Sequence, residues 1–192
     1  GASYLWQDAS INQELVVNSP GMYSVTVTDI NTCANSDSML LSLFSLPVVD
    51  LGKDTTICAS DSLVLNAQNP FAAFNWNVGA ITQTLVVSSP GFYHVTVTDS
   101  NTCSNTDSFT LAFFALPMVD LGPDTVICDQ DTLFLDAQNT TATFVWQDGS
   151  TNQTYFTLQA GTYTVTVTDT NTCSNTDSVM LNLFNLPIVN LG

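Results

Sequence analysis

The stretch GFYHVTVTDSNTC, residues 91–103, decides how this 192-residue chain folds. Tyr93, Val95 and Val97 alternate with polar residues. This period of two predicts a half-buried β-strand with one wet face. Near copies occupy residues 21–33 and 161–173, each 70 positions from the next. The chain is therefore a tandem repeat, and this strand belongs to its unit.

The repeat extends well beyond the strand. Residues 47–116 and 117–186 match at 39 of 70 positions without a gap. We therefore predict a partial repeat at 1–46, complete repeats at 47–116 and 117–186, and the start of another at 187–192. Because the sequence starts at the position equivalent to Phe71, we expect it to be a window on a longer array.

Each repeat contains several further candidate strands. We expect them at Val48–Leu51, Leu63–Ala67, Phe74–Val78, Gln83–Val87 and Ser108–Phe114. Turn residues separate these segments, and no segment has a helical period long enough for a helix. Six or seven short strands in 70 residues are typical of an immunoglobulin-like sandwich. The predicted class is all-β, with sandwiches in a linear array, a buried Trp76 on the third strand and a tyrosine corner at Tyr93.

The charge balance excludes several functions. The chain has 17 acids and one base, Lys53, for a net charge of −16. Binding to nucleic acid or to an anionic membrane surface needs clustered basic residues, which this chain lacks. No apolar run reaches the roughly 18 residues of a membrane helix, so we expect no direct membrane insertion.

The repeated motifs resemble a known family. They read DLGxDT…C from Asp50, FxWxxG…QT from Phe74 and PGxYxVTVTDxNxC from Pro90. Together they are similar to the PKD-like and immunoglobulin-like repeats of giant Bacteroidota cell-surface proteins, including adhesins associated with gliding motility. The resemblance covers every repeat. It implies a secreted or cell-surface location, export by the type IX route, and a stalk or adhesive role.

The repeats argue against an enzyme. Lys53 is replaced by Pro123 in the next repeat, and His94 by Ser24 and Thr164 in the other two. No nucleophile, base and orienting acid recur together. We predict no catalytic residues.

The cysteines are candidates for disulfides, because one of each kind recurs per repeat and none has zinc-site spacing. They are Cys33, Cys58, Cys103, Cys128 and Cys173, and we expect all of them to lie outside strands. The turn before the second strand and the hairpin after the sixth lie at opposite ends of a sandwich. This geometry favours an inter-domain bridge from Cys58 to Cys173. Intra-domain pairs, Cys58–Cys103 and Cys128–Cys173, and a bridge between chains remain the alternatives.

Recurring acids and amides make calcium the one candidate cofactor, since calcium takes six to eight oxygen ligands. The candidate ligands are Asp50, Asp54, Asp99, Asn101, Asp107, Asp120, Asp124, Asp169, Asn171 and Asp177. The alternative is that these side chains form turns and cap hairpins, as Asp and Asn commonly do.

The resemblance also implies O-glycosylation, because Bacteroidota modify Ser or Thr after Asp when an apolar residue or Thr follows. The candidate acceptors are Ser38, Thr55, Ser62, Thr125, Thr132 and Ser178.

Two functions fit this sequence. The first is a structural segment of a long extracellular filament or adhesin stalk built from disulfide-stapled repeats, with copies of itself as partners. The second is a carbohydrate- or surface-binding module. Asn101–Ser108 and Asn171–Ser178 are identical, which favours packing, whereas Asn69–Ala73 differs between repeats and leaves room for surface glycans as ligands.

Overall fold

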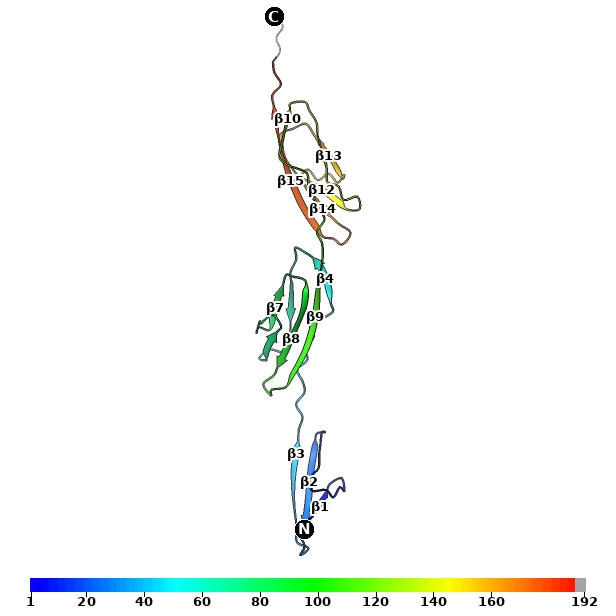
Figure 1. Ribbon diagram of the computed structural model, residues 1–192, viewed down its shortest axis with the longest axis vertical. Helices are drawn as coiled ribbons and strands as arrows, with labels where there is room; N and C mark the ends of the chain where they lie inside the picture. The colour runs from blue at the N-terminus through cyan, green and yellow to red at the C-terminus, as the bar shows by residue number, and fades with distance from the viewer. Residues whose placement is uncertain (189–192) are drawn as a thin grey trace.

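The computed structural model describes residues 1–188 and contains strands, turns and loops, with no helix in that range. Accordingly, this part of the chain offers no helix that could cross a bilayer. The three repeats lie end to end along the longest axis (Figure 1). Each sheet is formed by strands of one repeat. The predicted repeat boundaries stay a prediction, and the expected repeat start at 187–192 lies largely outside the described residues.

The second repeat is a six-stranded sandwich. Its strands are β4 (Thr55–Cys58), β5 (Leu63–Asn66), β6 (Ala73–Trp76), β7 (Thr84–Val87), β8 (Gly91–Thr98) and β9 (Ser104–Phe114). One sheet has the order β4-β9-β8-β6, and the other pairs β5 with β7. Strand β4 runs parallel to the end of β9, and the other pairs are antiparallel.

The third repeat has the same topology. Its strands are β10 (Thr125–Cys128), β11 (Leu133–Asp136), β12 (Thr143–Trp146), β13 (Thr154–Thr157), β14 (Gly161–Thr168) and β15 (Ser174–Phe184). The sheet orders are β10-β15-β14-β12 and β11-β13. The chain is therefore an all-β protein with tandem immunoglobulin-like sandwiches.

Alternating side chains build the core of each complete repeat. In β8, Tyr93, Val95 and Val97 are buried, and they pack with Trp76 and Phe109 between the two sheets. The Trp76 indole N–H donates to the Thr82 carbonyl at 2.8 Å, so the ring is buried without an unpaired donor.

The expected tyrosine corner is present. The Tyr93 hydroxyl donates to the Ser89 carbonyl at 2.7 Å, four residues upstream. Tyr23 and Tyr163 make the same bond at 2.7 and 2.6 Å. In the complete repeats this bond ties the start of the fifth strand, β8 or β14, to the preceding turn.

The first repeat has three strands in one sheet, β1 (Ser3–Trp6), β2 (Gly21–Thr28) and β3 (Ala34–Leu41), in the order β1-β2-β3. Residues 14–17 align with β7 but form no strand. Its β3 is also shorter than β9.

Two expectations about the strands are wrong. Val48–Leu51 forms no strand, and Thr55–Cys58 opens the sandwich in its place. The cause is that side chains from β9 and the 66–70 loop hold residues 47–51 in place, so this segment needs no ladder. Cys58 and Cys128 are the last residues of β4 and β10, so they do not lie outside the strands.

Candidate functional site: the junction between repeats

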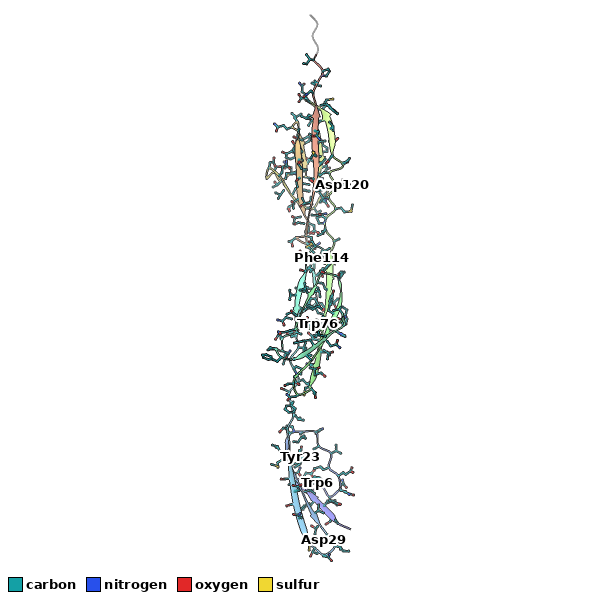
Figure 2. The ribbon with its side chains drawn as sticks, turned by 90° about the vertical axis from the view of Figure 1, so that its left-hand side faces the viewer. Trp6, Tyr23, Asp29, Trp76, Phe114 and Asp120 are labelled. Atoms are coloured by element: carbon teal, nitrogen blue, oxygen red, sulfur yellow. A yellow bond between two sulfur atoms is a disulfide. The ribbon has the colours of Figure 1, made fainter. Side chains whose placement is uncertain are left out.

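A disulfide joins the second repeat to the third. The Sγ atoms of Cys58 and Cys173 are 2.03 Å apart, and their Cα atoms are 5.4 Å apart across 115 positions of sequence. Parallel pairing with β9 places Cys58 opposite Phe114, at the end of the second repeat. Figure 2 shows Phe114 at this end, where the third repeat begins. The intra-domain alternatives are not formed in this structure.

A tight turn presents Cys173 to this bond. One carboxylate oxygen of Asp169 accepts from the backbone N–H groups of Asn171 and Cys173, at 2.8 and 2.9 Å. Thr172 takes a φ of 66°, which closes the hairpin between β14 and β15. Asp99 and Asp29 form the same turn around Cys103 and Cys33. The Asp of this motif therefore fixes the position of the hairpin cysteine.

The linker at the junction is held as well. Asn175 donates from its side-chain amide to the Pro117 carbonyl at 3.0 Å, and the Pro117 ring is buried. On the other side, the Ala59 N–H donates to the Phe114 carbonyl at 3.0 Å. Bonds on both sides of this short connection restrict rotation of one repeat against the other.

These amides were not among the candidate site residues. Asn105 holds Pro47 at 3.0 Å as Asn175 holds Pro117. Asn69 donates to the Val48 carbonyl at 2.6 Å. The available signal was the identity of these amides in both complete repeats, which resembles ordinary turn chemistry.

Backbone N–H groups donate to all the acids among the candidate calcium ligands, and Asp99 and Asp169 each accept two such bonds in the hairpin turn. Asp50 accepts from Gly52, Asp54 from Thr110 and Asp107 from Leu51, all at 2.7 to 2.8 Å. The equivalent acids of the third repeat, Asp120, Asp124 and Asp177, make the same bonds. Within residues 1–188 no three His, Cys, Asp or Glu side chains gather as a metal site. These contacts favour the turn alternative, and calcium binding stays a prediction.

The other cysteines form no bond inside the described chain. Cys33 and Cys128 are exposed, and Cys103 is half-buried. Cys128 ends β10 as Cys58 ends β4, and Cys103 follows β8 as Cys173 follows β14. Each thus has the local setting of one partner of the observed bond.

The candidate glycosylation sites are accessible. Ser38, Ser62, Thr132 and Ser178 are exposed, as is Thr55, and Thr125 is partly exposed. Ser178 lies on the exposed face of β15, next to the buried Val179, and Ser38 lies in the exposed part of β3. Their modification stays a prediction.

Two acids of the third repeat have lowered pKa values. The pKa of Asp136 is below its ordinary value of 3.8 because the Gln153 side chain donates to it at 2.9 Å, as does the Gln138 backbone. The pKa of Asp148 is lowered chiefly by the Ser150 backbone N–H. Tyr155 donates to Asp148, which raises the pKa of the tyrosine. These bonds stabilise loops and create no reactive group.

No family model matches the chain, and no curated protein matches it. Among solved structures, it is similar to the N-terminal eight Ig domains of Down Syndrome Cell Adhesion Molecule, with 16% identity, a TM-score of 0.31, and coverage of 96% of this chain and 36% of that one. It is also similar to the insect immune protein hemolin, with 13% identity, a TM-score of 0.41, and coverage of 85% of this chain and 56% of that one. The chain thus spans less than two thirds of either. At these identities the likeness concerns the fold alone, which the strand pairing defines as immunoglobulin-like.

Proposed function

We infer that this chain is a structural segment of a long extracellular filament or adhesin stalk made of disulfide-stapled immunoglobulin-like repeats. The observation that carries this proposal is the Cys58–Cys173 bond, which joins successive repeats. The Asn175 bond to the linker at Pro117 adds a second restraint. A covalent staple and a held linker resist bending, as a stalk requires.

The same bond can recur along an array. Cys128 offers the next β-strand cysteine, and Cys103 the hairpin cysteine of the second repeat. In this proposal each bonds its counterpart in an adjacent repeat, so copies of the repeat are the partners. Such disulfides persist in oxidising surroundings, which fits a secreted or cell-surface location.

Electron microscopy of the native material tests the stalk. Linear particles are expected. They should become flexible at the junction between the second and third repeats when Cys58 and Cys173 are both replaced by serine. Replacement of the exposed Cys33 by serine is the matched control. Dispersed globular particles alone would contradict a filament.

The source and the sugars rest on the motif resemblance. We propose a Bacteroidota surface protein, O-glycosylated at one or more of the six Asp-Ser/Thr sites. Native material should then have a mass above that of the unmodified sequence, which is 20.6 kDa for these 192 residues. Peptides that carry all six sites without added mass would contradict glycosylation.

Calcium at the junction acids is a separate proposal. Bound calcium stabilises the folded state by mass action, so calcium should raise the Tm and a chelator should lower it. A Tm unchanged by both would exclude a stabilising calcium site.

A glycan- or surface-binding role is the second candidate, and Phe71 favours it. This ring is 102% exposed, with a φ of 72°, on a loop that differs between the repeats. It lies beside Asn69, Ala72 and Asp99, which line a shallow depression. A glycan array with the chain and with Phe71→Thr, the residue of the third repeat, tests this role. Equal binding by both would contradict it.

A further inference from the structure

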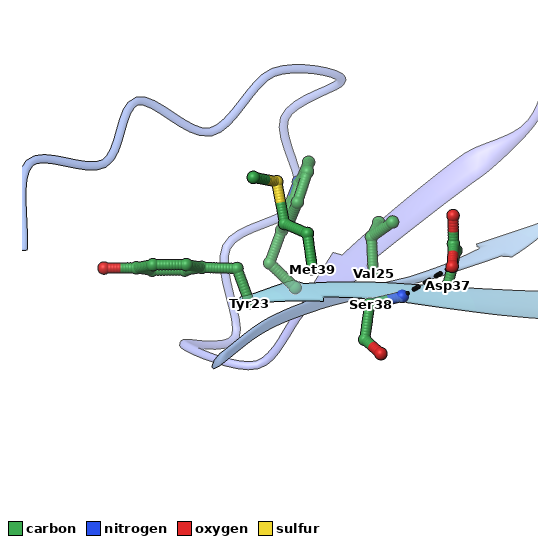
Figure 3. A pocket seen from close by; sticks show the side chains of 6 residues that line it. Tyr23, Val25, Asp37, Ser38 and Met39 are labelled. Atoms are coloured by element: carbon green, nitrogen blue, oxygen red, sulfur yellow. Dashed lines mark hydrogen bonds between the residues drawn. The ribbon is translucent and has the colours of Figure 1, made fainter. Parts of the chain in front are cut away.

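The inner face of the first sheet is open to solvent. In the second repeat Trp76 is 1%, Val95 0% and Phe109 3% exposed. Their equivalents Trp6 and Val25 are half-buried, and Met39 is 59% exposed. These three line a hollow with Tyr23 and Asp37, which we call the open face. Figure 3 shows Val25, Asp37 and Met39 on one side of the strands and Ser38 on the other.

Residues 47–70 cover the equivalent face of the second repeat, and we call this stretch the opening segment. Leu51, Leu65 and Ala67 from this segment are 9%, 2% and 0% exposed, in the same core as Trp76 and Val95. Leu135 and Ala137 are the equivalent buried residues in the core of the third repeat. The open face is therefore equivalent to the surface that the opening segment of the same repeat covers in the second and third repeats.

Polar partners on the open face match this segment. In the second repeat, Asp107 accepts from the Leu51 N–H at 2.7 Å and Asn105 donates to the Pro47 carbonyl. The first repeat keeps both side chains, as Asp37 and Asn35. Within the described residues, the hydrogen bond to the Asp37 carboxylate comes from its neighbour, Ser38.

The strand edges match as well. The end of β9 pairs in parallel with β4, and β7 pairs with β5. In the first repeat, β3 stops at Leu41 and residues 14–17 form no strand. Strands equivalent to β4 and β5 of an opening segment would pair at these two places, after the end of β3 and along residues 14–17.

A cysteine supplies an independent observation. The opening segment carries Cys58, which bonds the hairpin cysteine of the following repeat. The repeat that follows the open face presents Cys103 in that hairpin, unbonded within residues 1–188. An opening segment on the open face would bring its cysteine to Cys103.

We propose that the open face of the first repeat binds one further copy of the opening segment, a polypeptide with the sequence of residues 47–70, and that the cysteine of this segment forms a disulfide with Cys103. In the covalent step the two thiols lose two protons and two electrons. A small-molecule disulfide, such as oxidised glutathione, accepts the two electrons and the two protons and is reduced to two thiols. Both partners are acidic, so apolar burial and hydrogen bonds drive binding. The disulfide in this inference rests on the proposed function, in which Cys103 bonds a cysteine of an adjacent repeat, whereas reversible binding to the open face rests on the repeat architecture alone.

The first experiment measures reversible binding. A synthetic 47–70 peptide with Cys58→Ser is added to the 192-residue chain, and hydrogen exchange is followed in each strand. Protection is expected in β2 and β3, with β8 and β9 unchanged. A peptide with Leu51→Asp and Leu65→Asp should bind roughly 100-fold more weakly or worse, because each substitution places a charge at a position that is buried in the core of the second repeat.

The second experiment tests the disulfide. The wild-type peptide is incubated with the chain and oxidised glutathione, and the linked peptides are mapped without reduction. Attachment to Cys103 is expected, at least tenfold over Cys33 and Cys128, and Cys103→Ser should abolish it. Equal attachment at all three cysteines would overturn the proposal. So would unprotected β2 and β3, or a chain that pairs its open faces with each other and excludes the peptide.

Discussion

The first and second repeats share their strand sequence but not their burial. Tyr23, Val25 and Val27 repeat the pattern of Tyr93, Val95 and Val97, and both segments form eight-residue strands. The second set is at most 9% exposed, whereas the first is half-buried. Local pattern and hairpin chemistry therefore suffice to form these strands. A closed core needs the opening segment, which arrives from more than 25 positions away.

The largest expected difference concerns the tryptophans. Trp76→Ala should destabilise the second repeat by about 3–5 kcal/mol, because it removes a buried ring and leaves a cavity. Trp6→Ala should cost the first repeat far less, since Trp6 already contacts solvent. Hydrogen exchange at the Val95 and Val25 amides reports each repeat separately. Equal losses at both amides would mean that the first repeat is closed in solution.

The next largest effect on stability is expected at the junction between the second and third repeats. Replacing Cys58 and Cys173 together by serine should lower the unfolding free energy by about 2–4 kcal/mol, because the bond restricts the unfolded chain. The loss should fall on the second and third repeats and spare β2 and β3. Urea unfolding with and without reductant measures it. A wild-type chain that reductant does not weaken would contradict the expected contribution.

A partly buried hydrogen bond of the second repeat should give a smaller difference between the repeats. Asp107→Ala leaves the Leu51 N–H without its 2.7 Å partner. The second repeat should lose about 1–3 kcal/mol, the cost of an unsatisfied buried donor. The matched variant Asp37→Ala should change the first repeat by less than about 0.5 kcal/mol, as an exposed substitution does. Thermal unfolding of the two variants checks the contrast.

Low pH should destabilise the third repeat more than the second. Folding lowers the pKa of Asp136 below 3.8, so this group stabilises the fold above that pH, and its contribution is lost as the pH falls through the lowered pKa. The second repeat has Asn66 at this place, which does not titrate. The third repeat should therefore weaken more below pH 3.8, and Asp136→Asn should reduce the difference. Circular dichroism across an acid titration, with Asn66→Asp as the reciprocal variant, measures it.

Much of the fold follows from local pattern. Alternation around Val95 predicted β8, the spacing of the tryptophans predicted the buried third strand, and Tyr93 forms its corner. Local pattern failed at Val48–Leu51, where three hydrogen bonds from side chains distant in sequence replace a ladder. It also missed Thr55–Cys58, because the partner of this strand is more than 50 positions away.

The junction was less accessible from sequence. The cysteines and recurring acids were visible, and the two ends of a sandwich favoured the pairing that the structure contains. The amides that hold the linker were not singled out, because an Asn in a hairpin has the same pattern whether it caps its own turn or reaches a carbonyl 58 positions away.

The position of the staple also decides which residues carry a pulling force. When the two ends of the chain are drawn apart, the shortest covalent route passes from Cys58 directly to Cys173, and residues 59–172 between them are bypassed, over a sequence separation of 115. At roughly 3.3–3.6 Å per extended residue, about 400 Å of contour length is withheld while the bond is intact. The cores around Trp76 and Val165 lie largely inside this bypass. Reduction of this one bond would then release that length, so that thiol chemistry at a single junction sets how far the chain can be extended.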